Sequence, residues 1–401
     1  MTTEQSICVV GLGYIGLPTA ALLANRGYRV YGVDVNEAAV DTINQGRIHI
    51  VEPDLDTFVR AAVDSGHLTA HREPQAADIF VLAVPTPFAE DHVPDMTFVE
   101  SATRSVAGVV QPGNVVILES TSPVGTTEKV GRILDEEGAP IDELAIAHCP
   151  ERVLPGKVMI ELTENDRIVG GLTPEATTRV AQFYRGFVTG EVLETDARTA
   201  EMAKLVENAS RDVQIAFANE LSILCDRYGI NVWELIGLAN HHPRVNILKP
   251  GTGVGGHCIA VDPWFLITPA DGDAKLIETA RRRNTEKTEW VVEKVLSRVH
   301  AFEEEAGREP TVAAMGLAFK PDIDDLRESP SLYVARRLKS AGVHLVAVEP
   351  NIESHAEFTL LNAEDATREA DIVVFLVAHR SFKDVPVIPS KVLDFCGVIG
   401  L

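Results

Sequence analysis

Residues 7–34 constrain the fold of this 401-residue chain more than any other segment does. An apolar strand pattern leads into Gly11-x-Gly13-x-x-Gly16, and a helical pattern, a second apolar strand and Asp34 follow in that order. In such a unit the first glycine allows a tight turn, the second lets the backbone approach a pyrophosphate, and the third lets helix and strand pack closely. The order predicts a dinucleotide-binding unit. A glycine-rich turn beside a solvent-exposed aspartate is the alternative.

The residues around this motif predict which cofactor is bound. Asp34 can accept hydrogen bonds from the ribose of an adenosine, and an acid at this position favours NAD over NADP. The phosphates would lie at the helix N-terminus, where free N–H groups and the helix dipole favour negative charge. Thr86 and Thr121 follow two further strands and can contact the same cofactor, with ordinary turn chemistry as the alternative.

Strand and helix patterns alternate at both ends of the chain, which is typical of parallel sheets. In the N-terminal part, further strands are expected at Ala77–Val84, Val115–Leu118, Leu144–Ala147, Ile168–Gly171 and Gly190–Leu193. A smaller set without G-x-G-x-x-G lies near the C-terminus, with strands at Thr311–Met315, Val343–Val348 and Ala370–Val377, and an apolar end, Val392–Leu401, that can stop within a last strand.

The segment between these two parts has the periodicity of long helices. Apolar residues recur at spacings of three and four from Thr199 to a stop at Gly229, and Lys275–His300 also reads as helical. The sequence therefore predicts an α/β fold of two Rossmann-like doubly wound domains joined by a central long-helix dimerisation region. The expected boundaries are 1–198, 199–305 and 306–401.

Three polar residues of the long helix share one face. Lys204, Asn208 and Arg211 fall at i, i+4 and i+7, so they place an amide between two cations. Such a group suits the binding of an oxyanion, whereas a solvated polar face is the alternative.

The segment 251–262 combines four glycines, Cys258 and a carboxylate four residues later, Asp262. A thiol is unnecessary for oxidising an alcohol to a ketone, but it is useful when an alcohol is taken through an aldehyde to an acid, because a thiolate can hold the aldehyde as a thiohemiacetal. Asp262 or Glu151 can manage the protons and the water. A buried structural cysteine is the alternative reading.

Composition excludes several classes of protein. The net charge of −23 argues against nucleic-acid binding and against anionic membranes. The sequence contains no run of about 18 apolar residues, so no membrane span is predicted. No signal peptide is recognised at the N-terminus. The odd number of cysteines, five, without a CxxC, fits a reducing cytoplasm rather than a disulfide framework. No metal is expected, because the pair His241 and His242 lacks a second pair of ligands.

The order of eight motifs resembles the UDP-glucose/GDP-mannose dehydrogenase family over nearly the whole chain. The motifs are GLGYIGLP, VPTP, ESTSPVGTT, CPERVLPG, AEMAKLVENASRD, HPRVNI, GTGVGGHCIAVDPWFL and GLAFKPDIDDLRESP. The resemblance implies an NAD-dependent dehydrogenase in which Cys258 is the nucleophile and Lys204 stabilises the oxyanion or acts as acid or base. It also implies a homodimer in which Arg244 reaches into the site of the partner subunit.

The remaining site residues are implied by the same resemblance. The UDP-sugar would contact Arg152, Val153, Asn208, Arg211, His242, Arg244, Gly255, Phe319 and Lys320. NAD would contact Tyr14, Ile15, Asp34, Thr86, Thr121 and Arg327.

Within the family the chain is similar to the UDP-N-acetyl-D-mannosamine branch. UDP-glucose enzymes usually carry a second glutamate where Pro155 stands and a Lys-Asp pair where Val261-Asp262 stands. UDP-N-acetylglucosamine enzymes tend to have Pro-Val-Asp-Pro-Tyr where this chain has Ala260-Val261-Asp262-Pro263-Trp264. Both remain alternatives, as do a β-hydroxyacid dehydrogenase, which needs no cysteine, and a nucleotide-sugar sensor, which needs none of the catalytic residues.

Overall fold

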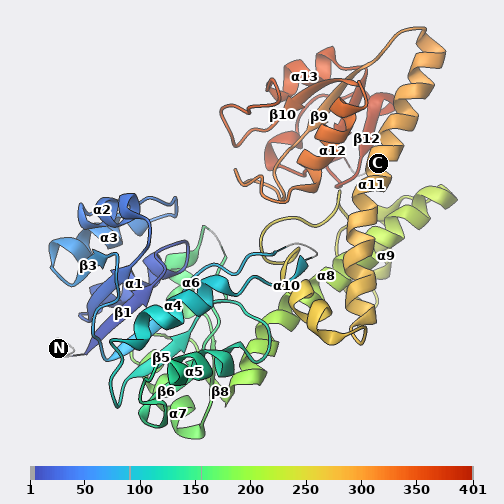
Figure 1. The fold of residues 1–401 in the computed structure, drawn as a ribbon. Coiled ribbons are helices and arrows are strands. Elements are labelled where there is room, and N and C mark those ends of the chain that lie inside the picture. Colours follow the sequence, from blue (N-terminus) through green and yellow to red (C-terminus); the bar gives the residue numbers. More distant parts are fainter. Residues whose placement is uncertain (1–4, 90–91, 155, 400–401) are drawn as a thin grey trace. The chain divides into compact units, whose positions relative to one another are not determined.

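The computed structural model describes residues 5–89, 92–154 and 156–399 (Figure 1). The chain divides into two compact units, Met1–Val206 and Glu207–Leu401. Helix α8 (Ala197–Tyr228) begins in the first unit and ends in the second. None of the described helices is both long enough and apolar enough to cross a lipid bilayer.

The first unit is built on a sheet of eight strands in the order β3-β2-β1-β4-β5-β6-β7-β8. The first six are parallel in the strand order of a dinucleotide-binding fold, β7 is antiparallel to β6, and β8 is parallel to β7. The strands are β1 (Ser6–Val10), β2 (Arg29–Val33), β3 (Leu68–His71), β4 (Ile79–Leu82), β5 (Val115–Leu118), β6 (Ala145–His148), β7 (Arg167–Gly171) and β8 (Val192–Asp196).

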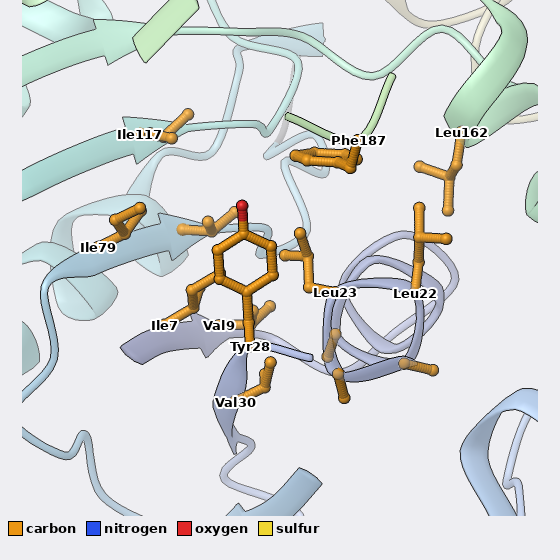
Figure 2. Close-up of a cluster of buried hydrophobic side chains, with 14 of the residues drawn as sticks. Ile7, Val9, Leu22, Leu23, Tyr28, Val30, Ile79, Ile117, Leu162 and Phe187 are labelled. Carbon is orange, nitrogen blue, oxygen red and sulfur yellow. The ribbon is translucent and has the colours of Figure 1, made fainter. Parts of the chain in front are cut away.

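Helices cover both faces of this sheet. The helices are α1 (Gly16–Asn25), α2 (Glu37–Asn44), α3 (Leu55–Asp64), α4 (Thr97–Ala107), α5 (Thr126–Glu136), α6 (Val158–Glu164) and α7 (Pro174–Arg185). Because side chains alternate along a strand, Ile7 and Val9 join the core under α1, whereas Cys8 joins the core under α4 and α5. Figure 2 shows the first of these cores, where the ring of Tyr28 lies among side chains of β1 and α1.

The second unit contains long helices and a parallel sheet of four strands in the order β10-β9-β11-β12. Its elements after α8 are α9 (Val232–Ala239), α10 (Asp262–Ile267), α11 (Lys275–Ala306), β9 (Thr311–Met315), α12 (Pro330–Ser340), β10 (His344–Val348), α13 (Ala363–Glu369), β11 (Ile372–Phe375) and β12 (Val392–Asp394). Helices α11 and α12 pack on one face of the sheet, and α13 packs on the other.

The predicted fold class is confirmed: two Rossmann-like sheets, one mostly and one wholly parallel, are joined by a region of long helices. Strand β3 and the helices α2 and α3 that precede it in the chain were not predicted from the sequence. The three-part division at 198 and 305 stays a prediction.

The predicted last strand, 392–401, is too long. Strand β12 ends at Asp394 because its carboxylate accepts hydrogen bonds from the N–H groups of Cys396, Gly397 and Ile399, so the chain folds around that side chain. Residues 400–401 lie outside the described part.

Candidate active site

The glycine motif after β1 forms a turn in which the glycines serve different structural purposes. A Cβ atom on Gly11 would lie 2.5 Å from the carbonyl oxygen of Ala83, and one on Gly16 would lie 1.8 Å from that of Gly11. Both glycines are therefore required by the packing of the fold. Gly13 is different, because a Cβ there would meet no described atom within 4 Å. The open space at Gly13 is what a pyrophosphate close to the backbone would need.

Asp34 follows β2 and is tied to this loop. One carboxylate oxygen accepts a hydrogen bond from the N–H of Leu12 at 3.0 Å, and the other accepts one from the N–H of Asn36 at 2.9 Å. The acid is thus held next to the glycine turn. This is the position from which an acidic side chain binds the ribose of a dinucleotide.

The other residues predicted to bind the cofactor in this unit lie at the same edge of the sheet. Thr86 follows β4 and Thr121 follows β5, and these strands neighbour β1 in one parallel run. Tyr14 and Ile15 precede α1, with Tyr14 exposed and Ile15 half-buried. The residues at this edge fit NAD, because the turn leaves room beside Gly13 and an acid stands where a ribose would bind.

Glu151, in the segment after β6, is buried in an ion pair. Its carboxylate contacts Nη1 of Arg167 on β7 at 2.5 Å and accepts the N–H of Arg152 at 2.6 Å. Its cationic partner is therefore Arg167 rather than the neighbouring arginine. Arg152 and Val153 are both half-buried, and Nη1 of Arg152 donates to the carbonyl of Asp166. Pro155 lies outside the described residues.

A second carboxylate belongs to this buried group. Glu119, which follows β5, accepts a hydrogen bond from the hydroxyl of Tyr184 at 3.1 Å. Burial, and then repulsion from Glu151, raises the pKa of Glu119 to about 7, although Arg167 acts to lower it. Two carboxylates thus share one arginine, so Glu119 keeps its proton well above the usual range of a glutamic acid.

In the second unit the segment 251–262, here called the cysteine loop, packs tightly against the protein itself. A Cβ atom on Gly253 would lie 2.2 Å from Oγ1 of Thr288, and one on Gly255 would lie 2.4 Å from the carbonyl oxygen of Glu328. Gly256 has a φ of +81°, and a Cβ there would lie 2.7 Å from the ring of Phe319. These glycines let the loop approach its own protein.

Cys258 lies at the start of a turn that leads into α10. Its carbonyl accepts the N–H of Val261 at 3.0 Å and that of Asp262 at 2.8 Å, so a helical turn separates the thiol from the acid. The Cys258 side chain is half-buried, whereas Cys8, Cys149 and Cys225 are buried.

Asp262 and Asn208 are brought together. Nδ2 of Asn208 donates to Oδ2 of Asp262 at 2.5 Å, although the two residues are 54 positions apart in the chain. Lys204 lies one turn before Asn208 on α8 and is half-buried, and Arg211 lies one turn after it and is exposed. The predicted spacing on this helix is therefore present.

The C-terminal candidates lie beside the cysteine loop. The carbonyl of Arg327 accepts the N–H of Gly256 at 3.2 Å, and the guanidinium of Arg327 pairs with Asp325 at 2.6 Å. The ring of Phe319 contacts the loop, and Nζ of Lys320 lies 5.9 Å from its centre.

His242 and Arg244 belong to the exposed stretch 241–246, where the N–H of Arg244 donates to Nδ1 of His242 at 3.3 Å. No group of histidines, cysteines and acids in the described part of the chain is arranged to hold a metal ion.

The turn after β9 corresponds in topology to the cofactor turn, but its N–H groups are occupied. Leu317 and Ala318 donate to Oε2 of Glu349 at 2.8 and 2.9 Å, and Nε2 of His379 lies 3.1 Å from the same oxygen. Glu349 follows β10, as Asp34 follows β2. This buried pair was not predicted from the sequence, and it occupies two N–H groups of the turn.

Profiles of one family match most of the chain. Residues 5–188 match the NAD binding domain of the UDP-glucose/GDP-mannose dehydrogenase family, residues 198–286 its central domain, and residues 313–398 its UDP binding domain.

Individual relatives match along most of their length. An NDP-N-acetyl-D-galactosaminuronic acid dehydrogenase of Ralstonia solanacearum is 54% identical over 394 residues, which cover 94% of this chain and 92% of the relative. A UDP-N-acetyl-D-mannosamine dehydrogenase of Yersinia pestis is 54% identical over 397 residues, covering 94% of each chain. The solved structure of a UDP-D-ManNAc dehydrogenase from Pyrococcus horikoshii superposes with a TM-score of 0.87 at 38% identity, covering 98% of this chain and 96% of that one.

The glycine packing of the cysteine loop predicts a clear difference between two substitutions. Gly255→Ala would force a methyl group against Glu328 and Pro330, so we expect it to lower unfolding free energy by about 1–3 kcal/mol and to reduce turnover. Gly251→Ala is the matched control, because the nearest heavy atom to its added Cβ would be 4.0 Å away. Thermal unfolding and activity assays compare the two, and equal behaviour of the variants would contradict the packing argument.

The raised pKa of Glu119 predicts how stability changes with pH. A carboxyl with a raised pKa in the folded state stabilises the fold at low pH, and this contribution is lost as the pH rises from about 4.5 towards about 7. We expect Glu119→Gln, which keeps the neutral form, to become more stable than the wild type above that range, by a few kcal/mol. Denaturant unfolding between pH 5 and pH 8 measures this difference. The exposed Glu136→Gln is the control, and a parallel pH dependence of wild type and Glu119→Gln would show that Glu119 is ionised throughout.

Proposed function

Because this chain belongs to the UDP-glucose/GDP-mannose dehydrogenase family, we propose that it oxidises the C6 hydroxyl of UDP-N-acetyl-D-mannosamine to the carboxylate of UDP-N-acetyl-D-mannosaminuronate. The chain is an NAD-dependent nucleotide-sugar dehydrogenase. The observation that carries the proposed chemistry is the half-buried Cys258, presented on a turn whose following acid, Asp262, is bound by Asn208.

The proposed reaction removes four electrons in two oxidations. NAD supplies the hydride acceptor for both. After the first oxidation, the thiolate of Cys258 adds to the aldehyde carbon and forms a thiohemiacetal. The second oxidation turns this adduct into a thioester, and water then hydrolyses the thioester to the free carboxylate and the thiol. One water molecule is consumed, and two molecules of NADH form per sugar.

The candidate catalytic residues other than Cys258 have distinct proposed tasks. Asn208 and Lys204 stabilise the oxyanion of the tetrahedral stages, because an amide N–H and an ammonium group both favour developing negative charge. Asp262 handles the proton of the attacking water, and Glu151 is the second candidate for that task. The hydrogen bond between Asn208 and Asp262 supports the roles proposed for these two residues, since it holds the amide and the acid together before substrate arrives.

The binding residues are proposed on the same basis. NAD is held by Gly11, Gly13, Tyr14, Ile15, Gly16, Asp34, Thr86, Thr121 and Arg327. The UDP-sugar is held by Arg152, Val153, Lys204, Asn208, Arg211, His242, Arg244, Gly255, Phe319 and Lys320.

The identity of the sugar is the most specific part of the proposal. A relative named for UDP-N-acetyl-D-mannosamine and one named for an N-acetyl-D-galactosaminuronic acid are equally identical to this chain at 54%. The segment Ala260-Val261-Asp262-Pro263-Trp264 favours the mannosamine branch over the glucosamine branch. UDP-N-acetylglucosamine and UDP-glucose remain alternative substrates.

A homodimer is proposed from an apolar stripe on α8. A pair of apolar residues recurs every 11 residues along this helix, a period that keeps a stripe nearly straight. The pairs are Met202 and Val206, Val213 and Phe217, and Leu224 and Tyr228. All of them except the half-buried Val213 are exposed in the single chain. A second copy of this helix is the proposed partner. The exposed stretch 241–246 would then carry Arg244 into the site of the partner subunit.

The proposed function predicts the amount of NADH formed per sugar. We expect two NADH per sugar with UDP-N-acetyl-D-mannosamine, and much slower turnover with the N-acetylgalactosamine, N-acetylglucosamine and glucose analogues. Cys258→Ser is expected to stall at or before the aldehyde stage. Absorbance at 340 nm and chromatography of the sugar products measure both. One NADH per sugar, or complete conversion to the acid by Cys258→Ser, would return Cys258 to a structural role, whereas two NADH with another sugar would correct the substrate alone.

The proposed dimer predicts complementation between two inactive variants. Cys258→Ser and Arg244→Ala should each lose most activity as homodimers. A heterodimer isolated with two different tags has one site with an intact Cys258 and the partner's intact Arg244, so we expect roughly half of the wild-type turnover per heterodimer. A heterodimer no more active than its parents would place Arg244 in the site of its own subunit.

A further inference from the structure

Helices α8 and α11 each carry a row of polar side chains on the side that faces the other helix. The row on α8 consists of Asp212 and Asn219, which are seven residues apart. The row on α11 consists of Arg281, Asn284 and Thr288, at i, i+3 and i+7. All five side chains are buried, and Asp212 and Arg281 are exposed by 0% and 4%. A helix buries such groups only when they find partners, because an unpaired buried charge is costly.

Four of these side chains, those of Asp212, Asn219, Arg281 and Asn284, form one continuous chain of hydrogen bonds. Nη1 of Arg281 donates to Oδ1 of Asp212 at 2.6 Å, and Nδ2 of Asn284 donates to the same oxygen at 2.8 Å. Nδ2 of Asn219 donates to Oδ1 of Asn284 at 2.8 Å. Each asparagine therefore uses its nitrogen as donor and its oxygen as acceptor, so the orientation of both amides is defined by their neighbours.

The chain of hydrogen bonds ends on the cysteine loop in two places. Oδ1 of Asn219 accepts the N–H of Gly251 at 2.9 Å, where the loop begins. Nη1 of Arg281 donates to the carbonyl of Ile259, the residue after Cys258, at 3.3 Å. Thr288 adds a third tie, because its hydroxyl donates to the carbonyl of Thr252 at 3.0 Å. The backbone on both sides of Cys258 is thus bound to the same two helices.

We propose that Asp212, Asn219, Arg281, Asn284 and Thr288 form a positioning cradle that sets the backbone of Cys258 before substrate binds. None of the five is proposed to touch substrate or cofactor. Arg281 acts through the Ile259 carbonyl, and Asp212 and Asn284 act by holding Arg281 and Asn219 in place. The inference rests on the proposed function only in taking Cys258 as the nucleophile.

The arrangement explains why polar groups occupy the space between two long helices. Apolar side chains of similar volume would pack there without any cost of desolvation, but they would leave the N–H of Gly251 and the carbonyl of Ile259 without these partners. A displacement of the thiol by about 1 Å is enough to reduce a reaction on the order of a hundredfold. Fixed backbone on both sides of the thiol prevents such a displacement.

The test measures the position of the thiol separately from folding. The variants are Arg281→Met, Arg281→Lys and Thr288→Val, and the control is Arg282→Met, the next residue on α11, which is exposed and pairs with Glu278. The readouts are the rate of iodoacetamide alkylation at Cys258 in the resting full-length enzyme, kcat and KM for the sugar, and the melting temperature. Peptide mass spectrometry assigns the alkylation to Cys258, with Cys258→Ser as the blank.

We expect Arg281→Met to change the alkylation rate and to lower kcat by about tenfold or more, while KM stays within about threefold. Arg281→Lys should recover part of both, Thr288→Val should show a smaller change in the same direction, and Arg282→Met should match the wild type. If Arg281→Met does not fold, the decision falls to the two milder variants.

Variants that melt earlier but keep the wild-type alkylation rate and kcat would overturn the cradle and leave these residues a purely structural role. That result is distinct from failure of the proposed function. The latter would appear as full acid formation by Cys258→Ser, whatever the alkylation rates are.

Discussion

The close approach of the cysteine loop to its own protein is the constraint on which the rest of the second unit depends. Gly253, Gly255 and Gly256 fill positions where a single methyl group would collide with Thr288, Glu328 or Phe319. Because the loop lies so close, short side chains such as Thr288 and Asn219 reach its backbone. A loop held at a larger distance would need longer and more flexible partners, and the thiol would be less well defined.

The two Rossmann-like units show how one topology is used in two ways. Each has an acid after its second strand that accepts N–H groups from the turn after its first strand. In the first unit Asp34 is half-buried and the turn stays open at Gly13, so a cofactor can approach. In the second unit Glu349 is buried against His379 and uses two N–H groups of the turn. The same topology thus leaves room beside the turn of one unit and places a buried acid on the turn of the other.

The sequence predicted the elements whose patterns are local. The glycine motif and the long helix α8 both follow from spacing within a few residues, and the structure contains them. Partners distant in the chain were not predicted: Arg281 lies 69 residues from Asp212, and Arg167 rather than Arg152 pairs with Glu151. The polar residues at i, i+3 and i+7 on α11 were a usable signal for the first pair. No local signal identifies the pair of Glu151 and Arg167, because the adjacent Arg152 looks like the obvious partner of Glu151 in the sequence.

Helix α8 connects these observations, because its two sides carry different tasks. At 100° per residue, Asn208, Asp212 and Asn219 lie on one side of the helix, and Val206, Phe217 and Tyr228 lie on the opposite side. The first side holds the acid and the backbone of the cysteine loop, and the second is the side proposed to meet another subunit. Both sides belong to one continuous helix of 32 residues. Assembly of the proposed dimer would therefore brace the element that positions the thiol, which gives a physical reason for a small-molecule enzyme to build its nucleophile against an interface helix.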